Sequence, residues 1–177
     1  MVLDTWLQCI RKRLPQLLTL KRFLRTHRGR PNLAMKYTGQ KLTDHFEGCR
    51  LEAYQDGCGI WTIGYGHTKN VYKGMVITED QAIKLQESDI AIAEQCVSLN
   101  VKVPLTQDEF NALVDFTYNL GCRNFRTSTM LTLLNKKDYI GAAAQFNRWD
   151  YGGGKQIAGL LYRRMAETKE FDGESYA

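Results

Sequence analysis

Apolar residues recur at helical spacing along most of the chain after about residue 78. Two capping boxes mark helix starts there, Thr78 with Gln81 and Thr106 with Glu109. In each box the first side chain accepts a hydrogen bond from the backbone three residues later, and the Gln or Glu side chain reaches back. The predicted helices cover residues 78–99, 106–121, 127–136, 139–148 and 157–171. The second half of the chain is therefore expected to be helical throughout.

A different pattern precedes these helices. Two runs rich in β-forming residues, LEAY and IWTIGYGH, flank the segment QDGCG, which predicts a small antiparallel hairpin with Asp56 and Gly57 at its turn. Before the hairpin, GQKLTDHFE places Leu42 and Phe46 on one face of a short helix that ends at Gly48. A helix, a small sheet and a helical body in this order predict an α+β fold. A cleft between the two parts is a natural place for a ligand.

Residues 1–34 differ from the rest of the chain in charge. They hold eight Lys or Arg against one Asp, whereas the remaining residues carry 16 basic and 18 acidic groups. Their apolar positions form a heptad-like stripe between basic ones, typical of a basic amphipathic helix that Pro15 would break or kink. We expect a basic extension over 1–34 and a domain over 35–177. A translation start at Met35 would produce the domain without the extension. The acidic balance of that domain gives no reason to expect nucleic-acid binding.

The chain shows no sequence signal for membrane insertion or secretion. No apolar run reaches the ~18 residues that a membrane-spanning helix needs. Two basic groups interrupt the apolar positions near the N-terminus: Arg11, Lys12 and Arg13, then Lys21 and Arg22. A secretory signal would need a continuous apolar stretch there, so the protein is expected to leave the cytoplasm by a separate route.

The five cysteines are Cys9, Cys49, Cys58, Cys96 and Cys122. Their number is odd, and no pair has the spacing of a metal site. Free thiols in a protein made in a reducing cytoplasm are therefore the expected state. Cys49 and Cys58, on either side of the first β run, are the pair that a regulatory disulfide would use.

Two carboxylates nine residues apart, Glu47 and Asp56, are candidates for a catalytic pair. Such a pair suits glycoside hydrolysis, which needs one protonated acid and one ionised partner. The negative end of the helix dipole and apolar neighbours favour the protonated form of Glu47, whereas Asp56 in a glycine-rich turn is expected to stay ionised. The Thr62 hydroxyl on the second strand is placed to hold a water. Acid pairs at this spacing also occur by chance, so Asp44 and Glu52 remain open as alternatives.

The residues around this pair resemble a known family signature. Glu47, Asp56 and Thr62 give the pattern Glu-x8-Asp-x5-Thr, followed by IGYGHT. This pattern resembles the bacteriophage lysozymes of glycoside hydrolase family 24, the endolysins of T-even and lambdoid phages. Three later segments resemble the same family: GMVITEDQAIKLQESDI, LTQDEFNALVDFTYNLG and RWDYGGGKQIAGLLYRRMAE. The resemblance covers about residues 36–171 in the family's order.

The resemblance implies a lysozyme-like fold and muramidase activity, the hydrolysis of the β-1,4 bond between N-acetylmuramic acid and N-acetylglucosamine in peptidoglycan. By matched position, Glu47 is the general acid, Asp56 is the nucleophile or electrostatic partner, and Thr62 positions water. His67 is expected to be a buried hydrogen-bonding residue that ties the sheet to the body. The resemblance implies no metal and no other cofactor.

Contacts with the sugar are expected from three further residues by their position in the family: Thr68, Tyr118 and Gln145. Tyr118 is suited to stack on a saccharide or to form a hydrogen bond with it. Each of the three is also a good packing residue. Arg163 or Arg164 either lies near Glu47 or covers the surface of the last helix, and the sequence does not decide between these placements.

The N-terminal segment departs from the family pattern. Relatives of the lambdoid kind often begin with a weakly hydrophobic signal-arrest-release segment, and this chain has a charged one instead. We therefore expect a monomer that is made in the host cytoplasm, released through a holin, and active on the periplasmic cell wall. Residues 1–34 are expected to meet an anionic membrane or the outer-membrane surface, so membrane disruption is an alternative function. A catalytically silent peptidoglycan-binding module is disfavoured, because it would not need the complete Glu, Asp and Thr set.

Overall fold

The structure is a computed structural model that describes residues 30–57, 59–152 and 154–174. Most of the expected basic extension and Cys58 lie outside the described residues. The helices are α2 (Gln40–Phe46), α3 (Glu79–Asn100), α4 (Gln107–Leu120), α5 (Cys122–Thr127), α6 (Thr129–Leu134), α7 (Tyr139–Ala143) and α8 (Ala158–Phe171), with a 3-10 helix η1 (Phe146–Arg148). The strands are β1 (Arg50–Gln55), β2 (Trp61–Gly64), β3 (Tyr151–Gly152) and β4 (Lys155–Gln156). Within the described ranges, no helix has the length and apolar character that crossing a membrane requires.

The two long helices begin at the capping boxes that the sequence predicts. The Thr78 hydroxyl accepts from the Gln81 backbone N–H at 3.3 Å, and the Gln81 side chain accepts from the Thr78 N–H at 2.8 Å. Thr106 and Glu109 make the same reciprocal pair at 3.1 and 2.7 Å. After α4 the chain turns at Gly121, whose φ of 82° is costly for other residues. Both helix predictions are confirmed.

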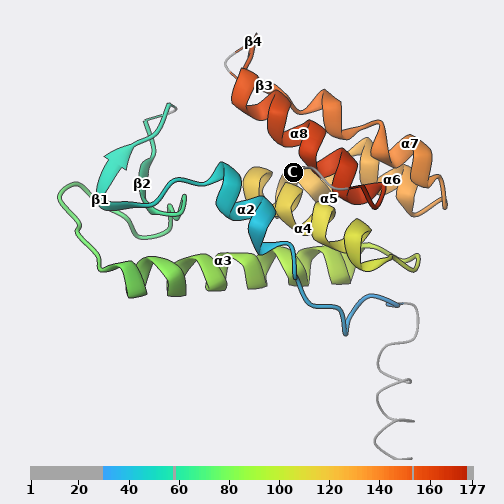
Figure 1. Cartoon of the computed structure of the whole chain (residues 1–177), viewed down its shortest axis with the longest axis horizontal. Coiled ribbons are helices and arrows are strands. Elements are labelled where there is room, and N and C mark those ends of the chain that lie inside the picture. Colours follow the sequence, from blue (N-terminus) through green and yellow to red (C-terminus); the bar gives the residue numbers. More distant parts are fainter. Residues whose placement is uncertain (1–29, 58, 153, 175–177) are drawn as a thin grey trace, which may run out of the picture.

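The core of the helical body lies where α4 packs between α3 and α8 (Figure 1). Phe116 of α4 is fully buried there. Its ring makes edge-to-face contacts with Phe125, Phe146 and Trp149. This geometry brings the positive edge of one ring to the negative face of another. Helix α5 and η1 are thereby held against α4.

The small lobe is an antiparallel sheet that lies to one side of the helical body (Figure 1). Strands β1 and β2 pair with Tyr54 opposite Thr62, which leaves residues 56–60 as the turn. Ile63 of β2 is fully buried and belongs to a small apolar cluster with the start of α3. Helix α3 runs beneath both lobes and connects them (Figure 1). The predicted α+β fold with a hairpin lobe and a larger helical lobe is confirmed.

Three segments differ from the sequence prediction. The helix expected over 127–136 is the shorter α6, because Ser128 ends a separate helix α5 and caps α6 by accepting from the Leu131 N–H at 3.0 Å. The helix expected over 139–148 is divided into α7 and η1. The segment DYGGGK was expected as a loop but carries the short strands β3 and β4. All three differences are local and lie in the helical lobe.

Cys96 and Cys122 form a disulfide, so the expectation of free thiols is wrong for this pair. Their Cα atoms lie 5.9 Å apart, which suits such a bond. Helix α4 leads the chain back along α3 and brings the start of α5 beside the last turns of α3 (Figure 1). Spacing along the sequence does not show this contact. Cys49 is an exposed free thiol, and its expected partner Cys58 lies outside the described residues.

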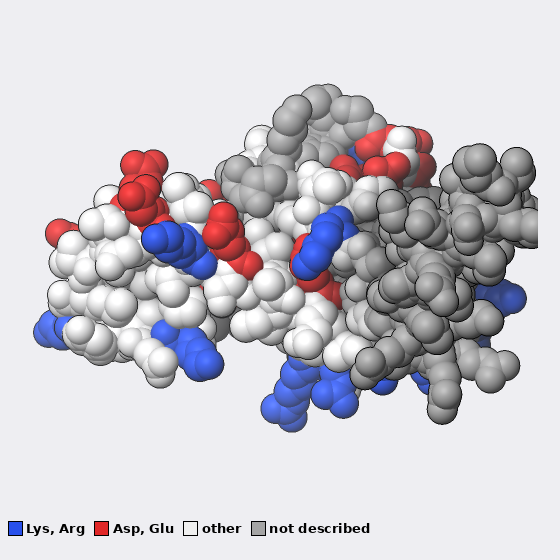
Figure 2. All heavy atoms as spheres, turned by 90° about the horizontal axis from the view of Figure 1, so that it is seen from below, with Lys and Arg blue, Asp and Glu red and all other residues white. Residues whose placement is uncertain are grey.

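Acidic and basic side chains lie in small separate groups over the described part of the face that α3 crosses (Figure 2). No single sign of charge covers the described part of this face.

Candidate active site

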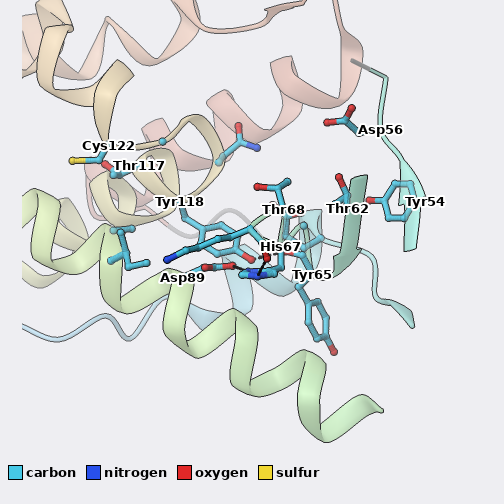
Figure 3. A pocket seen from close by; sticks show the side chains of 17 residues that line it. Tyr54, Asp56, Thr62, Tyr65, His67, Thr68, Asp89, Thr117, Tyr118 and Cys122 are labelled. Carbon is cyan, nitrogen blue, oxygen red and sulfur yellow. Dashed lines mark hydrogen bonds and ion pairs between the residues drawn. The ribbon is translucent and has the colours of Figure 1, made fainter. Parts of the chain in front are cut away.

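A cleft of about 430 Å³ lies between the hairpin lobe and helices α3 and α4. Its volume is within the range of small-molecule and sugar sites. Asp56 and Thr62 lie at one end of the cleft, and Thr117 and Cys122 lie at the other (Figure 3). Five of the six catalytic and sugar-binding residues expected from the sequence line this cleft, Glu47, Asp56, Thr62, Thr68 and Tyr118, and so does His67.

Glu47 lies at the C-terminal end of α2, as the helix pattern predicts. Its backbone N–H donates to Thr43 O at 3.0 Å, and its own backbone is extended, which ends the helix. Gly66 lies next to its carboxylate with a φ of 90°. A glycine adopts this φ without strain and leaves the carboxylate open to the cleft.

The carboxylate of Glu47 is bound by a buried arginine from α8. Arg163 Nη1 donates to Glu47 Oε1, while Nε and Nη2 donate to the two carboxylate oxygens of Asp115 at 3.0 and 3.1 Å. Asp115 is fully buried and also accepts from the Thr43 hydroxyl at 2.8 Å. Burial alone would lower the pKa of Arg163, but the charges of Asp115 and Glu47 outweigh it and raise that pKa. Arg163 therefore stays charged and places its positive charge on the Glu47 carboxylate.

Asp56 occupies the turn between β1 and β2. Its Oδ1 accepts from the Ile60 backbone N–H at 2.8 Å, and its own N–H donates to Ile60 O at 3.0 Å. These two bonds close the turn and fix the carboxylate at the edge of the cleft. The half-buried side chain is directed toward the cleft interior (Figure 3).

Thr62 lies on β2, opposite Tyr54 of β1. The residue is 4% exposed, and its hydroxyl donates to Ile60 O at 3.0 Å. A threonine hydroxyl that donates one hydrogen bond still has an oxygen that accepts another. Thr62 can therefore hold a water molecule in the cleft without giving up its own bond.

His67 ties the hairpin lobe to α3. Its Nδ1 lies 2.7 Å from Asp89 Oδ2, and its Nε2 lies 2.9 Å from Lys69 O. Its backbone also pairs with Ile63 through two bonds of 2.9 Å. Both ring nitrogens are thus engaged within the protein, which supports a positioning role for His67.

The three expected sugar contacts are placed differently. Thr68 and Tyr118 line the cleft. The Tyr118 hydroxyl donates to Tyr65 O at 2.5 Å, and burial, followed by the negative charge of Glu47, raises the pKa of this phenol well above its usual value. Gln145 does not line the cleft, because it follows α7 and its side-chain amide donates back to Gly141 O at 3.3 Å.

The two alternative acids, Glu52 and Asp44, are not among the described residues that line the cleft. Glu52 is exposed on β1, bridges to Val76, and is not among the residues that line the cleft. Asp44 lies in α2, and its side chain is outside the described part of the structure.

Three residues in and around the cleft were not assigned from sequence. Asp89 binds His67, and Asn119 lines the cleft while accepting from Arg164 at 3.0 Å. Arg163 was left open between two placements, and the structure places it on Glu47. The Arg163–Arg164 pair in the segment GLLYRR was the available signal, but nothing in its local pattern tells which arginine turns inward.

The arrangement provides two carboxylates in one cleft with different surroundings. Glu47 is held by a guanidinium, and Asp56 is held by a backbone N–H in a turn. Two acids in unlike surroundings are what hydrolysis of a glycosidic bond requires. Among the described residues, no group of three or more His, Cys, Asp or Glu side chains is arranged to hold a metal ion.

Comparison with known proteins identifies close relatives over most of the chain. The family model described as phage lysozyme matches residues 44–167. An endolysin of Acyrthosiphon pisum secondary endosymbiont phage 1 is 43% identical over 138 residues, which span 76% of this chain and 94% of that protein. A SAR-endolysin of Bacteriophage PS119 is 40% identical over 73% of this chain and 78% of its own length. The structure of an endolysin from Escherichia coli O157:H7 phage FAHEc1 superposes with a TM-score of 0.70, at 36% identity, over 80% of this chain and 97% of that one.

Proposed function

The chain belongs to the phage lysozyme family, and on that premise we propose that Glu47, Asp56 and Thr62 carry out its reaction. Its activity is that of a phage endolysin with a lysozyme-like fold. It is a glycoside hydrolase that cleaves the β-1,4 bond between N-acetylmuramic acid and N-acetylglucosamine in peptidoglycan, which lyses the host cell.

The proposed roles follow from the placement of the three side chains. Glu47 donates a proton to the leaving sugar oxygen, because it is the carboxyl group that a helix end and Arg163 hold in the cleft. Asp56 stabilises the positive charge that develops at the sugar or attacks it, and Thr62 positions a water. The observation that supports this assignment most strongly is that all three line one cleft, while the exposed Glu52 does not.

The assignment is tested with Glu47→Gln, and Glu52→Gln serves as the matched control five residues away. Removing a general acid lowers a rate by about 10²- to 10⁴-fold. We therefore expect Glu47→Gln to fold but not to clear a suspension of chloroform-treated Gram-negative cells, whereas Glu52→Gln clears it like the wild type. Full clearing by a folded Glu47→Gln variant would refute the assignment.

We also propose that Thr68 and Tyr118 contact the glycan. Tyr118 would do so through its ring, because its hydroxyl is already bonded to Tyr65 O. Gln145 stays a prediction from family position, without support from the residues that line the cleft. Binding of chitooligosaccharides to single variants at these positions, measured by calorimetry, would separate the three.

The proposed boundary between extension and domain shifts toward the N-terminus. Asn32 is buried and donates to Val103 O at 2.8 Å, while its own Oδ1 accepts from the Leu105 N–H at 3.1 Å. A domain that begins at residue 35 would leave these backbone groups unpaired. We propose that the catalytic domain includes residues 30–34, so a truncation should begin no later than residue 30.

We further propose that the basic residues of 1–34 bind anionic membrane and that the enzyme is a monomer released through a holin. Their charge and apolar spacing support membrane binding. Dye leakage from anionic vesicles, caused by full-length protein but not by a 30–177 truncation, tests the first point, and size-exclusion chromatography tests the second. The relative from phage PS119 is named a SAR-endolysin, and release by a signal-arrest-release segment is the route that competes with release through a holin. Lysis of cells that express the chain without a holin would favour that route.

A further inference from the structure

Lys69 is the one Lys or Arg among the described residues that line the cleft. Its side chain is exposed, and within the described part of the chain its ammonium has neither an ion pair nor a hydrogen bond. The acidic residues in the described lining are Glu47, Asp56 and Asp89. The cleft therefore presents a single unpaired cation among three acids.

The backbone that carries Lys69 is firmly held. Lys69 O lies 2.9 Å from His67 Nε2, and His67 Nδ1 lies 2.7 Å from Asp89 on α3. On the other side of this loop, Tyr65 O accepts from the Tyr118 hydroxyl of α4. The loop from 65 to 69 is thus anchored to both helices that face it. A long side chain on an anchored backbone searches a small volume, which lowers the entropy lost when it binds a ligand.

The chemistry of the substrate suggests what such a cation meets. The N-acetylated sugars of the glycan are neutral, and the anionic groups of peptidoglycan are carboxylates on the muramyl side. They belong to the attached peptide or, where the peptide has been removed, to the lactyl group itself. Glu47 is already paired with Arg163, so Lys69 is the cation in the described lining that is left to meet such a group.

We propose that Lys69 forms a carboxylate-binding subsite that recognises the acidic substituent of the muramyl residue. This inference rests on the proposed function of the cleft and adds a specificity-determining residue to it. The ammonium binds as a point charge with three donors, so it accepts a carboxylate without requiring one fixed geometry. Lys69 acts on binding of the substrate and takes no part in proton transfer.

The experiment compares wild type, Lys69→Met, Lys69→Arg and Lys73→Met on three substrates at low concentration, where the rate reports kcat/KM. The substrates are intact peptidoglycan, peptidoglycan freed of its peptides by an amidase, and peptidoglycan whose carboxyl groups are amidated with carbodiimide and ammonia. Lys73 is an exposed lysine outside the cleft lining and serves as the matched control. Thermal unfolding of each variant accompanies the rates, and an exposed side chain at position 69 predicts no change in midpoint.

Loss of one charge-assisted contact predicts a rate about five- to twenty-fold lower for Lys69→Met on intact peptidoglycan. Lys69→Arg and Lys73→Met should stay near the wild-type rate. On amidated peptidoglycan the wild type should fall to the level of Lys69→Met. A deficit of Lys69→Met on the peptide-free glycan as well shows that Lys69 also binds the lactyl carboxylate that the amidase exposes, and a deficit on intact material alone shows that it binds a carboxylate of the peptide.

Equal rates of Lys69→Met and wild type on intact peptidoglycan would overturn the inference. A deficit that persists on the amidated substrate would do the same, because no carboxylate is left there to bind. Glu47→Gln is measured in parallel. Its inactivity alongside a fully active Lys69→Met refutes the subsite alone, whereas activity of Glu47→Gln refutes the proposed function of the cleft.

Discussion

Replacement of Arg163 by methionine should be among the most destabilising single changes in this chain. Arg163 is 3% exposed, and its guanidinium binds both oxygens of Asp115 and one oxygen of Glu47. Methionine fills much of the same space but removes both hydrogen bonds from the guanidinium to Asp115, which keeps the one from the Thr43 hydroxyl at 2.8 Å. Removing one partner of a buried ion pair costs about 3–5 kcal/mol, because the other charge stays buried without compensation.

The assay is urea unfolding followed by circular dichroism, repeated for Asp115→Asn and for the double variant. For a protein of this size the loss corresponds to a melting point lower by roughly 6–20 °C. The double variant should be less destabilised than the two single changes added together, since it leaves no buried charge at position 115 without a partner. Glu47→Gln should cost far less than Arg163→Met, because the Glu47 side chain is 18% exposed and keeps contact with water. A cost below about 1 kcal/mol for Arg163→Met, or simple additivity in the double variant, would refute the reasoning.

Three further outcomes follow from contacts near the cleft. Replacing Cys96 and Cys122 by serine should lower the unfolding free energy by about 3 kcal/mol, and reductant should do the same to the wild type but not to the variant. His67→Asn should cost about 1–3 kcal/mol in urea unfolding, because Asp89 loses its partner on the ring; an unchanged midpoint would contradict this. The raised pKa of Tyr118, caused by burial, means that the folded state keeps this proton where the unfolded chain releases it. Stability should therefore fall as pH rises above about 10, and Tyr118→Phe should weaken that fall.

The elements that the sequence predicts well are those with a local cause. The starts of α3 and α4 follow from Thr78 and Thr106, whose partners lie three residues away. The hairpin follows from its turn residues, and the place of Glu47 follows from the end of a short helix. Each of these features depends on contacts within a few residues, so a pattern along the chain is enough to predict them.

The features that the sequence did not predict depend on contacts between distant segments. The Cys96–Cys122 disulfide needs α4 to return along α3 before the two sulfur atoms meet. Gln145 was expected at the sugar by family position, yet its amide bonds to Gly141 on its own helical segment. The interior also contains charges, such as Asp115, where a hydrophobic pattern predicts apolar residues.

The surroundings of Glu47 show why local reasoning gives the place of a side chain but not all of its partners. The helix end and the apolar neighbours of Glu47 are local, so a pattern along the chain is enough to predict them. Arg163 is 116 residues away in sequence, yet its positive charge touches the same carboxylate. A buried arginine shared between Glu47 and Asp115 holds the acid in position while Asp115 takes up part of its charge. Because Asp115 fixes the guanidinium that binds Glu47, Asp115→Asn should lower kcat of the folded enzyme, measured as the rate of turbidity loss. An unchanged kcat in a folded Asp115→Asn variant would show that Arg163 holds the Glu47 carboxylate without help from Asp115.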